Sequence, residues 1–407
     1  MGETNTNLPP LKQLHGRLRR ITERLARELA RPGGTAPEWS DLDWQLARAV
    51  AALHGVSALL ATKLRWSGPR DWQDFLAEQR GHVEVRHRRI EQLLRQLDVL
   101  ARKEAVSLVG LKGAALHACG LYRAGERPMA DIDLLVHPQQ SASATRLLES
   151  LGYSERFATP RHKVFMPQVA APTAAVGEHA DNYLKIELHE RITECLPYRS
   201  VDVTALVRPR DTHPGLIGYP SRAAMLSHLL IHAAGAIAFR SVRLLHLNDL
   251  ALVASSMSNA DWQELLVRAT ERVSPWWALP PLQLTARYFD IVIPDEVLKE
   301  LAAVCPWNLR RITHRQSLSD ASFSFLWIEA FPGIGWSRSI SELLEYMGAR
   351  IRPGREVMRL RQIQAETETA AAHSQWSKLS QGQRLVRWLT SRQPRMDTLH
   401  AVRRALQ

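Results

Sequence analysis

Cysteine is scarce in this sequence of 407 residues, which contains only three. Cys119, Cys195 and Cys305 lie far apart and form no CxxC pair. A disulfide framework needs more cysteines at closer spacing, and a redox pair needs two in one motif. We therefore expect three ordinary thiols in a reducing compartment.

Long hydrophobic runs are also missing. The first twenty residues are polar and lack the apolar core of a signal peptide. The most apolar run, Leu226 to Phe239, has fourteen residues and includes His228 and His232. A helix needs about 20 apolar residues to cross a bilayer. The sequence thus predicts a cytoplasmic protein without a transmembrane segment.

Two common nucleotide-binding motifs are absent as well. No glycine-rich stretch has the GxxxxGK[ST] spacing of a P-loop or the GxGxxG spacing of a dinucleotide-binding fold. No internal repeat is found either. If the chain binds a nucleotide, it does so with another motif.

Positive charge is in surplus. Lys and Arg number 53 against 41 acidic residues, which gives a formal net charge of +12. Such a surplus fits an anionic partner. It is equally typical of Arg-rich proteins encoded by GC-rich genomes, so both explanations stay open.

The stretch from Ser107 to Gly152 contains a pair of carboxylates with a chemical rationale. Its centre reads DIDLLV, in which Asp131 and Asp133 are two residues apart in a predicted strand. Alternate strand residues share a face, so the two carboxylates would lie side by side and repel each other. A hard cation such as Mg²⁺, or Mn²⁺ in its place, relieves that repulsion. The pattern predicts a metal site at Asp131 and Asp133.

A predicted strand-to-helix turn precedes this pair. After the strand Ser107 to Val109, the turn from Gly110 to Gly113 leads into a predicted helix over 114–121. Glycines at such a turn let a phosphate approach the backbone, and Lys112 adds a positive charge. Arg127, in the loop before the DxD strand, either neutralises phosphate or is a solvated loop charge.

A second predicted strand offers a third carboxylate. In KIELH, Glu187 shares a face with Lys185 and His189, opposite two apolar residues. Glu187 can complete the metal site only if its strand neighbours that of Asp131. His189 either contacts metal or phosphate, or fixes a carboxylate through a hydrogen bond.

The segments LKGAAL, RPMADIDLLV and KIELHERI, with Gly152-Tyr153, resemble the uncharacterised nucleotidyltransferases of the DNA polymerase β-like superfamily. The resemblance covers roughly residues 40 to 300. It implies an α+β fold in which a polymerase β-like core with a mixed sheet is embedded in helical regions. It also implies that Asp131, Asp133 and Glu187 bind Mg²⁺ or Mn²⁺.

The same resemblance implies a metal-dependent enzyme that moves a nucleoside monophosphate from an NTP such as ATP to an unidentified acceptor. That acceptor is a small molecule, a peptide, a protein or RNA. The sequence departs from the superfamily pattern at Ala114, where a serine is usual, and in the sixteen residues between Ala114 and Asp131. These departures leave a catalytically inactive binding protein as one alternative. The positive charge leaves a toxin-like enzyme that modifies RNA as another.

The rest of the sequence has mainly helical patterns. Before the core we expect helices at Leu11 to Ala30, Leu42 to Leu64 and Asp71 to Ala105, and from Ser221 five more are expected, at 222–239, 241–256, 261–272, 276–289 and 295–303. The predicted regions are an N-terminal helical region (1–105), the nucleotidyltransferase core (106–220), a helical domain beside the cleft (221–305) and a helical, aromatic-rich and basic C-terminal region (306–407).

Two features of the helical domain keep two interpretations each. His228 and His232 are four residues apart on one helix, where they either ligate a transition metal or pack against a neighbour. Arg243 and Asp249 lie either near the substrate, as the resemblance implies, or in a buried Arg–Asp pair that locks two helices.

Overall fold

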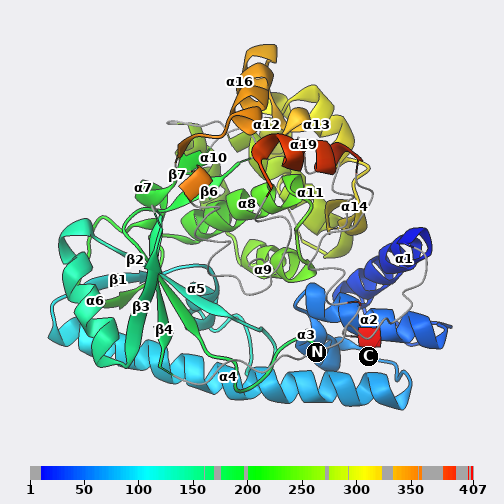
Figure 1. The fold of residues 1–407 in the computed structure, drawn as a ribbon, viewed down its shortest axis with the longest axis horizontal. Coiled ribbons are helices and arrows are strands. Elements are labelled where there is room, and N and C mark those ends of the chain that lie inside the picture. The colour runs from blue at the N-terminus through cyan, green and yellow to red at the C-terminus, as the bar shows by residue number, and fades with distance from the viewer. Residues whose placement is uncertain are drawn as a thin grey trace.

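A mixed β-sheet on one side of the molecule and a helical body on the other make up the fold (Figure 1). The computed structural model describes residues 11–159, 161–168, 176–196, 200–270, 275–291, 293–322, 333–355, 357–359, 379–390, 402 and 405–406. The predicted fold class, a mixed sheet embedded among helices, is confirmed.

Four helices precede the sheet: α1 (Leu11–Ala30), α2 (Asp41–Leu53), α3 (Ser57–Lys63) and α4 (Arg70–Lys103). The expected single helix from Leu42 to Leu64 is therefore wrong, because it breaks into α2 and α3. The break contains Gly55 with φ +67°, a left-handed conformation that favours glycine and ends a helix. The start of α2 follows the sequence signal, since Ser40 and Asp43 form a reciprocal capping box.

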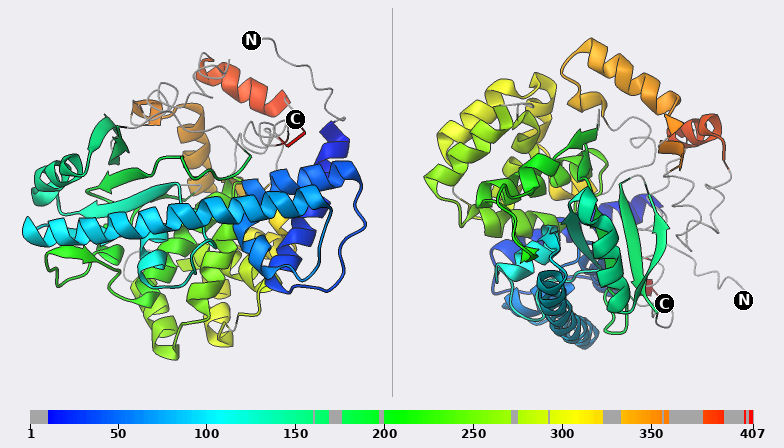
Figure 2. Two further views of the ribbon diagram at one scale, coloured as in Figure 1. Left: turned by 90° about the horizontal axis from the view of Figure 1, so that it is seen from below. Right: turned by 90° about the vertical axis from the view of Figure 1, so that its left-hand side faces the viewer.

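Helix α4 connects two hydrophobic cores. Its 34 residues extend about 51 Å at 1.5 Å per residue, and Figure 2 shows it running along most of the molecule. Near its start, Trp72 and Phe75 pack into a core shared with the helical body. Near its end, Ile90 and Leu97 pack into a second core under the sheet. The helix thereby holds the sheet and the helical body together.

The six-stranded sheet has the order β3-β4-β5-β2-β1-β8. Its strands are β1 (Ser107–Gly110), β2 (Asp131–Val136), β3 (Tyr153–Ala158), β4 (His162–Pro167), β5 (Lys185–His189) and β8 (Gly215–Ile217). Strand β2 pairs in parallel with β5 and antiparallel with β1, while β1 and β8 are parallel. Strand β8 was not expected from the sequence.

The two faces of the sheet have different surroundings. On one face, Ile132, Leu134 and Ile186 are fully buried in the core that α4 shares with α6 (Ser141–Ser150). Since side chains alternate along a strand, Asp131 and Asp133 lie on the opposite face. That face meets α5 (Lys112–Ala118) and the helical body, so it is where polar chemistry can take place.

A short hairpin and the helical body follow β5. The hairpin is β6 (Thr193–Cys195) and β7 (Ser200–Asp202), and β6 packs on α8. The described helices and 3₁₀ turns after the hairpin are α7 (Thr204–Val207), α8 (Arg222–Ala238), α9 (Leu244–Ala254), α10 (Asn259–Thr270), η2 (Pro275–Ala278), α11 (Leu279–Tyr288), α12 (Asp295–Val304), α13 (Trp307–Thr313), α14 (Leu318–Ser322), η3 (Ile334–Trp336), α16 (Ile340–Ile351) and α19 (Gln381–Thr390). One more 3₁₀ turn, η1 (Pro138–Gln140), lies earlier, between β2 and α6. The five helices expected from Ser221 onward correspond to α8 to α12, with a 3₁₀ turn before α11.

Much of the predicted C-terminal region lies outside the described residues, including Phe323, Phe325, Trp327 and Phe331 and residues 360–378. The division of the chain into four regions stays a prediction. The three cysteines are all unpaired thiols. Among the described helices, none combines the length and apolarity needed to cross a membrane.

A buried histidine in the helical body predicts acid sensitivity. The Nδ1 atom of His54 accepts a hydrogen bond from the backbone N–H of Leu244 at 3.0 Å, which ties the end of α2 to the start of α9. Burial, aided by the positive charge of Arg243, lowers the pKa of His54 to about 3. The unfolded chain therefore binds a proton near pH 6.5 that the folded chain does not, so stability falls as the pH drops below 6.5.

At pH 5 this single group should cost about 2 kcal/mol of the free energy of unfolding. His54→Asn keeps an acceptor for the Leu244 N–H and loses the titration. Urea unfolding at pH 7.5 and pH 5 should show a smaller loss in the variant than in the natural protein. Equal losses would contradict the assignment.

Candidate active site

The predicted carboxylate pair and the predicted third carboxylate lie on neighbouring strands. In the parallel pairing of β2 with β5, Asp131 is opposite Lys185 and Asp133 is opposite Glu187. Directly paired residues share a face of the sheet. The expectation that the Asp131 and Glu187 strands are neighbours is therefore confirmed, and one surface holds all three carboxylates.

Lys185 lies between two of these carboxylates. Its Nζ atom is 2.5 Å from Glu187 Oε1 and 3.5 Å from Asp131 Oδ2. Burial lowers the pKa of Lys185, but the nearby carboxylates, Glu187 first, outweigh burial and raise it. The ammonium group thus supplies part of the positive charge that the sequence analysis expected beside the repelling carboxylates.

Lys112 supplies positive charge on the other side of Asp133. It is the first residue of α5, and its Nζ atom lies 3.8 Å from Asp133 Oδ1 and 3.5 Å from Glu194 Oε1. Burial lowers its pKa, but Asp133 and Glu194 more than compensate, so the group stays protonated. Its φ of +45° is unusual for a residue other than glycine. The strained conformation of the turn thus falls on the lysine and not on the glycines beside it.

Asp131 and Asp133 differ in their electrostatic surroundings. Burial raises the pKa of Asp131, and repulsion from Asp133 adds to the rise, although the side chain is 42% exposed. Burial also opposes ionisation of Asp133, but Lys112 and a hydrogen bond with His189 lower its pKa well below the usual value. Asp133 is therefore ionised and buried, whereas burial and Asp133 keep the pKa of Asp131 raised even though Lys185 lies 3.5 Å away.

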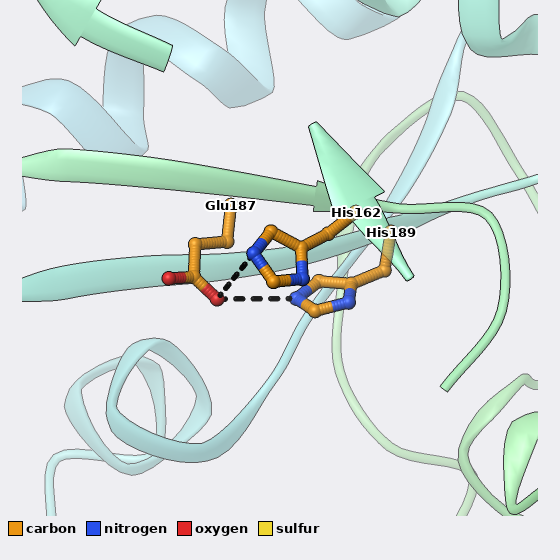
Figure 3. Close-up of side chains that lie close together, drawn as sticks. All are labelled: His162, Glu187 and His189. Carbon is orange, nitrogen blue, oxygen red and sulfur yellow. Dashed lines mark ion pairs between the residues drawn. The ribbon is translucent and has the colours of Figure 1, made fainter. Parts of the chain in front are cut away.

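Two histidines face Glu187 from neighbouring strands. In the antiparallel pairing of β4 with β5, His162 is opposite His189. Figure 3 shows both rings turned toward the Oε2 atom of Glu187, at 3.6 Å from His162 Nε2 and 3.7 Å from His189 Nε2. His189 Nε2 is also 3.2 Å from Asp133 Oδ1, so one ring contacts both carboxylates.

These three side chains have metal-ligand chemistry. Within the described residues, His162, Glu187 and His189 are the one group of at least three potential ligands whose ligand atoms all lie within 4.8 Å of one another. For His189, both roles left open by the sequence therefore have a structural basis.

A fourth carboxylate, which the sequence analysis missed, lies at the edge of the site. Glu194 on β6 accepts from His228 Nε2 at 3.1 Å and lies 3.2 Å from His232 Nδ1. Burial opposes its ionisation, yet Lys112 and the two histidines hold its pKa well below the ordinary value. The His228 and His232 pair thus contacts a carboxylate from a neighbouring hairpin, which is the packing interpretation of their spacing.

A hydrogen-bonded chain links this carboxylate to the turn at Lys112. The backbone N–H of Lys112 donates to Tyr219 Oη at 3.1 Å, and Tyr219 Oη lies 2.7 Å from His228 Nδ1. If the tyrosine donates to Nδ1, the proton of His228 is on Nε2, where it donates to Glu194. Burial lowers the pKa of His228, which favours this neutral form. The chain fixes the position of the strained lysine.

Arg127 is engaged by the helical body. Its Nε and Nη2 atoms donate to the two carboxylate oxygens of Asp249 on α9, both at 2.9 Å. Tyr122 also donates to Asp249, and Asn248 donates to Tyr122. The arginine and aspartate side chains are 9% and 4% exposed, so the pair is buried. Asp249 therefore locks α9 to the loop before β2, with Arg127 as its partner.

The two glycines of the turn differ in the space available for a side chain. A Cβ atom on Gly113 would lie 2.5 Å from Met129 Sδ and 2.8 Å from Arg127 Nη1, whereas one on Gly110 would come no closer than 3.6 Å to any neighbour. Gly113 thus gives room to the loop that holds Arg127. The sequence had assigned that space to a phosphate.

Gly113→Ala should destabilise the protein by about 1–3 kcal/mol, the usual cost of an overpacked interior. Gly110→Ala is the matched control, and we expect its unfolding free energy to stay within about 0.5 kcal/mol of the natural protein. Chemical denaturation of the two variants checks this. Equal stability of the two alanine variants would show that Met129 and Arg127 yield without cost.

Three contributors to the site had no recognisable sequence signal of their role. Glu194 belongs to a three-residue strand, and His162 pairs with His189, 27 residues later. Lys185 shares the Glu187 face by alternation, but only the β2–β5 register brings it to Asp131.

Comparison with known proteins gives one match. Neither the curated proteins nor the solved structures contain a significant match to this chain. The family model described as uncharacterised nucleotidyltransferase matches residues 40–290, which span the sheet, the carboxylate site and the helices up to α11. Because this match covers more than half of the chain and includes the whole site, the protein belongs to that family of nucleotidyltransferases.

Proposed function

We propose that the protein transfers a nucleoside monophosphate from an NTP, ATP being the first to test, to an acceptor. The observation that carries the proposal is the β2–β5 register, which puts Asp131, Asp133 and Glu187 on one face next to Lys112. In the reaction an acceptor oxygen forms a bond to the α-phosphorus. The bond from that phosphorus to the bridging oxygen breaks, pyrophosphate leaves and the acceptor loses its proton.

The three carboxylates offer oxygen ligands of the kind that a hard divalent ion takes. Mg²⁺ and Mn²⁺ take carboxylate oxygens, and the raised pKa of Asp131, caused by burial and then by Asp133, marks repulsion that a cation would relieve. We assign Asp131, Asp133 and Glu187 as the residues that hold it. When bound, such an ion offsets charge on the phosphate oxygens and lowers the pKa of the acceptor hydroxyl.

Lys112 and the turn from Gly110 to Gly113 are proposed to bind the triphosphate. The Lys112 ammonium group lies within 4 Å of Asp133, so a phosphate bound to the lysine would be next to the carboxylate site. Arg127 already makes a bidentate pair with Asp249. We propose that it acts on the nucleotide by holding the loop before β2 in place.

The alanine at position 114 is compatible with activity. Its side chain is only 2% exposed and packs in the apolar core under the sheet. In this proposal the Lys112 ammonium group binds the phosphate, and no hydroxyl at position 114 is needed.

Glu187→Gln should lower turnover by roughly a hundredfold while it keeps NTP affinity within a few-fold. The amide is nearly isosteric with the carboxylate but uncharged. In this proposal the charge of Glu187 contributes more to the transfer step than to the binding of the NTP. Glu187→Asp should be milder. Steady-state kinetics with an identified acceptor and nucleotide titration measure both effects, and full activity of Glu187→Gln would remove this residue from the site.

A labelling screen tests the proposal and can identify the acceptor. Purified protein is incubated with each α-labelled NTP, Mg²⁺ or Mn²⁺, and a lysate separated into RNA, protein and small molecules. We expect label in one fraction, dependent on the ion. Label in RNA would favour an RNA-modifying enzyme and give the positive charge a role. Nucleotide binding without transfer to any fraction would favour a binding protein that has lost turnover.

A further inference from the structure

The two oxygens of Glu187 face different partners. Oε1 is turned toward Lys185, which also contacts Asp131, while Oε2 is turned toward His162 and His189. Figure 3 shows Oε2 as the common neighbour of the two rings. The carboxylate therefore has two sets of neighbours, one that consists of Lys185 and the Asp131 carboxylate it also contacts, and one that consists of two imidazole rings.

We propose that the nitrogen-rich set, formed by His162 Nε2, His189 Nε2 and Glu187 Oε2, binds a transition metal ion of the Zn²⁺ type. Two histidines and one carboxylate with an open fourth position are the ligand set of catalytic zinc sites. Imidazole nitrogen suits zinc and related ions, whereas Mg²⁺ prefers oxygen. The nitrogen-rich set and the three carboxylates therefore prefer different ions.

The distances fit this assignment. Tetrahedral coordination with bonds of about 2.1 Å separates neighbouring ligand atoms by about 3.4 Å. The two nitrogen-to-Oε2 distances are 3.6 Å and 3.7 Å, and the ligand atoms all lie within 4.8 Å of one another. The two distances to Oε2 are thus within about 0.3 Å of the tetrahedral separation.

The strands provide a rigid support. His162 and His189 are direct partners in the β4–β5 ladder, and their rings lie 4.9 Å apart between centroids. Both side chains are largely buried, at 19% and 11% exposed. Ligands on paired strands are held in place before the ion arrives, which lowers the entropic cost of binding it.

Asp133 connects the two ion positions. Its Oδ1 atom lies 3.2 Å from His189 Nε2, so it borders the nitrogen-rich set as well as the carboxylate set. In the metal-free protein this nitrogen donates to Asp133, and an ion would take the place of that proton. Sites with two metal ions about 3.5–4 Å apart are common in phosphoryl-transfer enzymes. A catalytic role for this ion rests on the proposed function. The binding of the ion does not, because it requires neither nucleotide nor turnover.

Metal binding alone tests the proposal. Metal-free protein, without nucleotide, is titrated with Zn²⁺ against a chromogenic chelator, and with Co²⁺, whose visible absorption reports tetrahedral coordination. We expect one site per chain. Loss of a group that only hydrogen-bonds a metal ligand typically weakens metal binding by roughly 10- to 100-fold. His162→Gln removes a ligand itself, so it should weaken Zn²⁺ binding by at least that much and remove the tetrahedral Co²⁺ spectrum. His213→Gln, at an exposed histidine outside this set, is the control and should bind like the natural protein.

A second variant separates this site from the proposed magnesium site. Asp131→Asn should weaken Mg²⁺-dependent nucleotide binding and leave Zn²⁺ affinity within a few-fold. His162→Gln should weaken Zn²⁺ binding and leave Mg²⁺-dependent nucleotide binding within a few-fold. Thermal unfolding without metal checks that the variants fold. Wild-type Zn²⁺ affinity in folded His162→Gln, or no Zn²⁺ site in the natural protein, would overturn the inference. Loss of nucleotide transfer in both variants with intact Zn²⁺ binding in Asp131→Asn would leave it standing.

Discussion

Asp131→Asn combined with Asp133→Asn is expected to abolish nucleotidyl transfer and the thermal stabilisation of the protein by Mg²⁺ or Mn²⁺. The two carboxylates share one face of β2, and both would lose their charge without a change of shape. The effect should exceed that of Glu187→Gln because two ligands are lost together. Thermal unfolding with and without each ion, followed by transfer assays, measures it.

A control pair shows whether the effect is specific. Asp181→Asn with Asp211→Asn removes the same charge from two exposed positions and should leave the response to the ions unchanged. Lys112 keeps Glu194 as a carboxylate partner when Asp133 is neutralised, and thermal unfolding without metal checks that the Asp131 and Asp133 variant folds. Unchanged stabilisation by Mg²⁺ or Mn²⁺ in this variant would exclude the metal assignment.

Arg127→Met should have the largest effect on stability, a loss of about 3–5 kcal/mol in the free energy of unfolding. Among the described residues Arg127 is the one ion-pair partner of Asp249, so the change leaves this buried carboxylate without a paired cation there, although Tyr122 still donates to it. Since the pair joins the loop before β2 to α9, nucleotide affinity should fall with it. Chemical denaturation and nucleotide titration measure the two effects.

A second substitution distinguishes a buried pair from a phosphate ligand. Asp249→Leu added to Arg127→Met removes the unpaired charge and should recover much of the lost stability. If Arg127 acts by position, nucleotide affinity should recover partly with stability. Full stability with no recovery of affinity would show that its guanidinium binds phosphate directly.

The local pattern of the sequence was enough to predict most of the elements that hold the site. The alternation of apolar and acidic residues predicted that Asp131 and Asp133 share one face of their strand and that Glu187 lies on the polar face of its own strand. The structure pairs these two strands. The periodicity of the helices after Ser221 predicted α8 to α12 within a few residues. Such patterns succeed because they record which side of an element is buried.

Long-range pairing is what the sequence could not supply. Nothing near Arg127 indicates that its partner is Asp249, 122 residues away, and nothing near His162 indicates that it faces Glu187. Glu194 is in a strand too short to show a period. The break at Gly55 was missed because the apolar stripe continues through it and hides the left-handed residue.

The fate of two labels on one nucleotide tests the central claim most directly. ATP labelled at the α-phosphate and ATP labelled at the γ-phosphate are incubated in parallel with protein, Mg²⁺ and the fraction that contains the acceptor. Nucleotidyl transfer puts the α-label on the acceptor and releases the γ-label as pyrophosphate, and both events should disappear in Asp131→Asn with Asp133→Asn. Appearance of the γ-label on the acceptor, or of the α-label with the double variant, would contradict it.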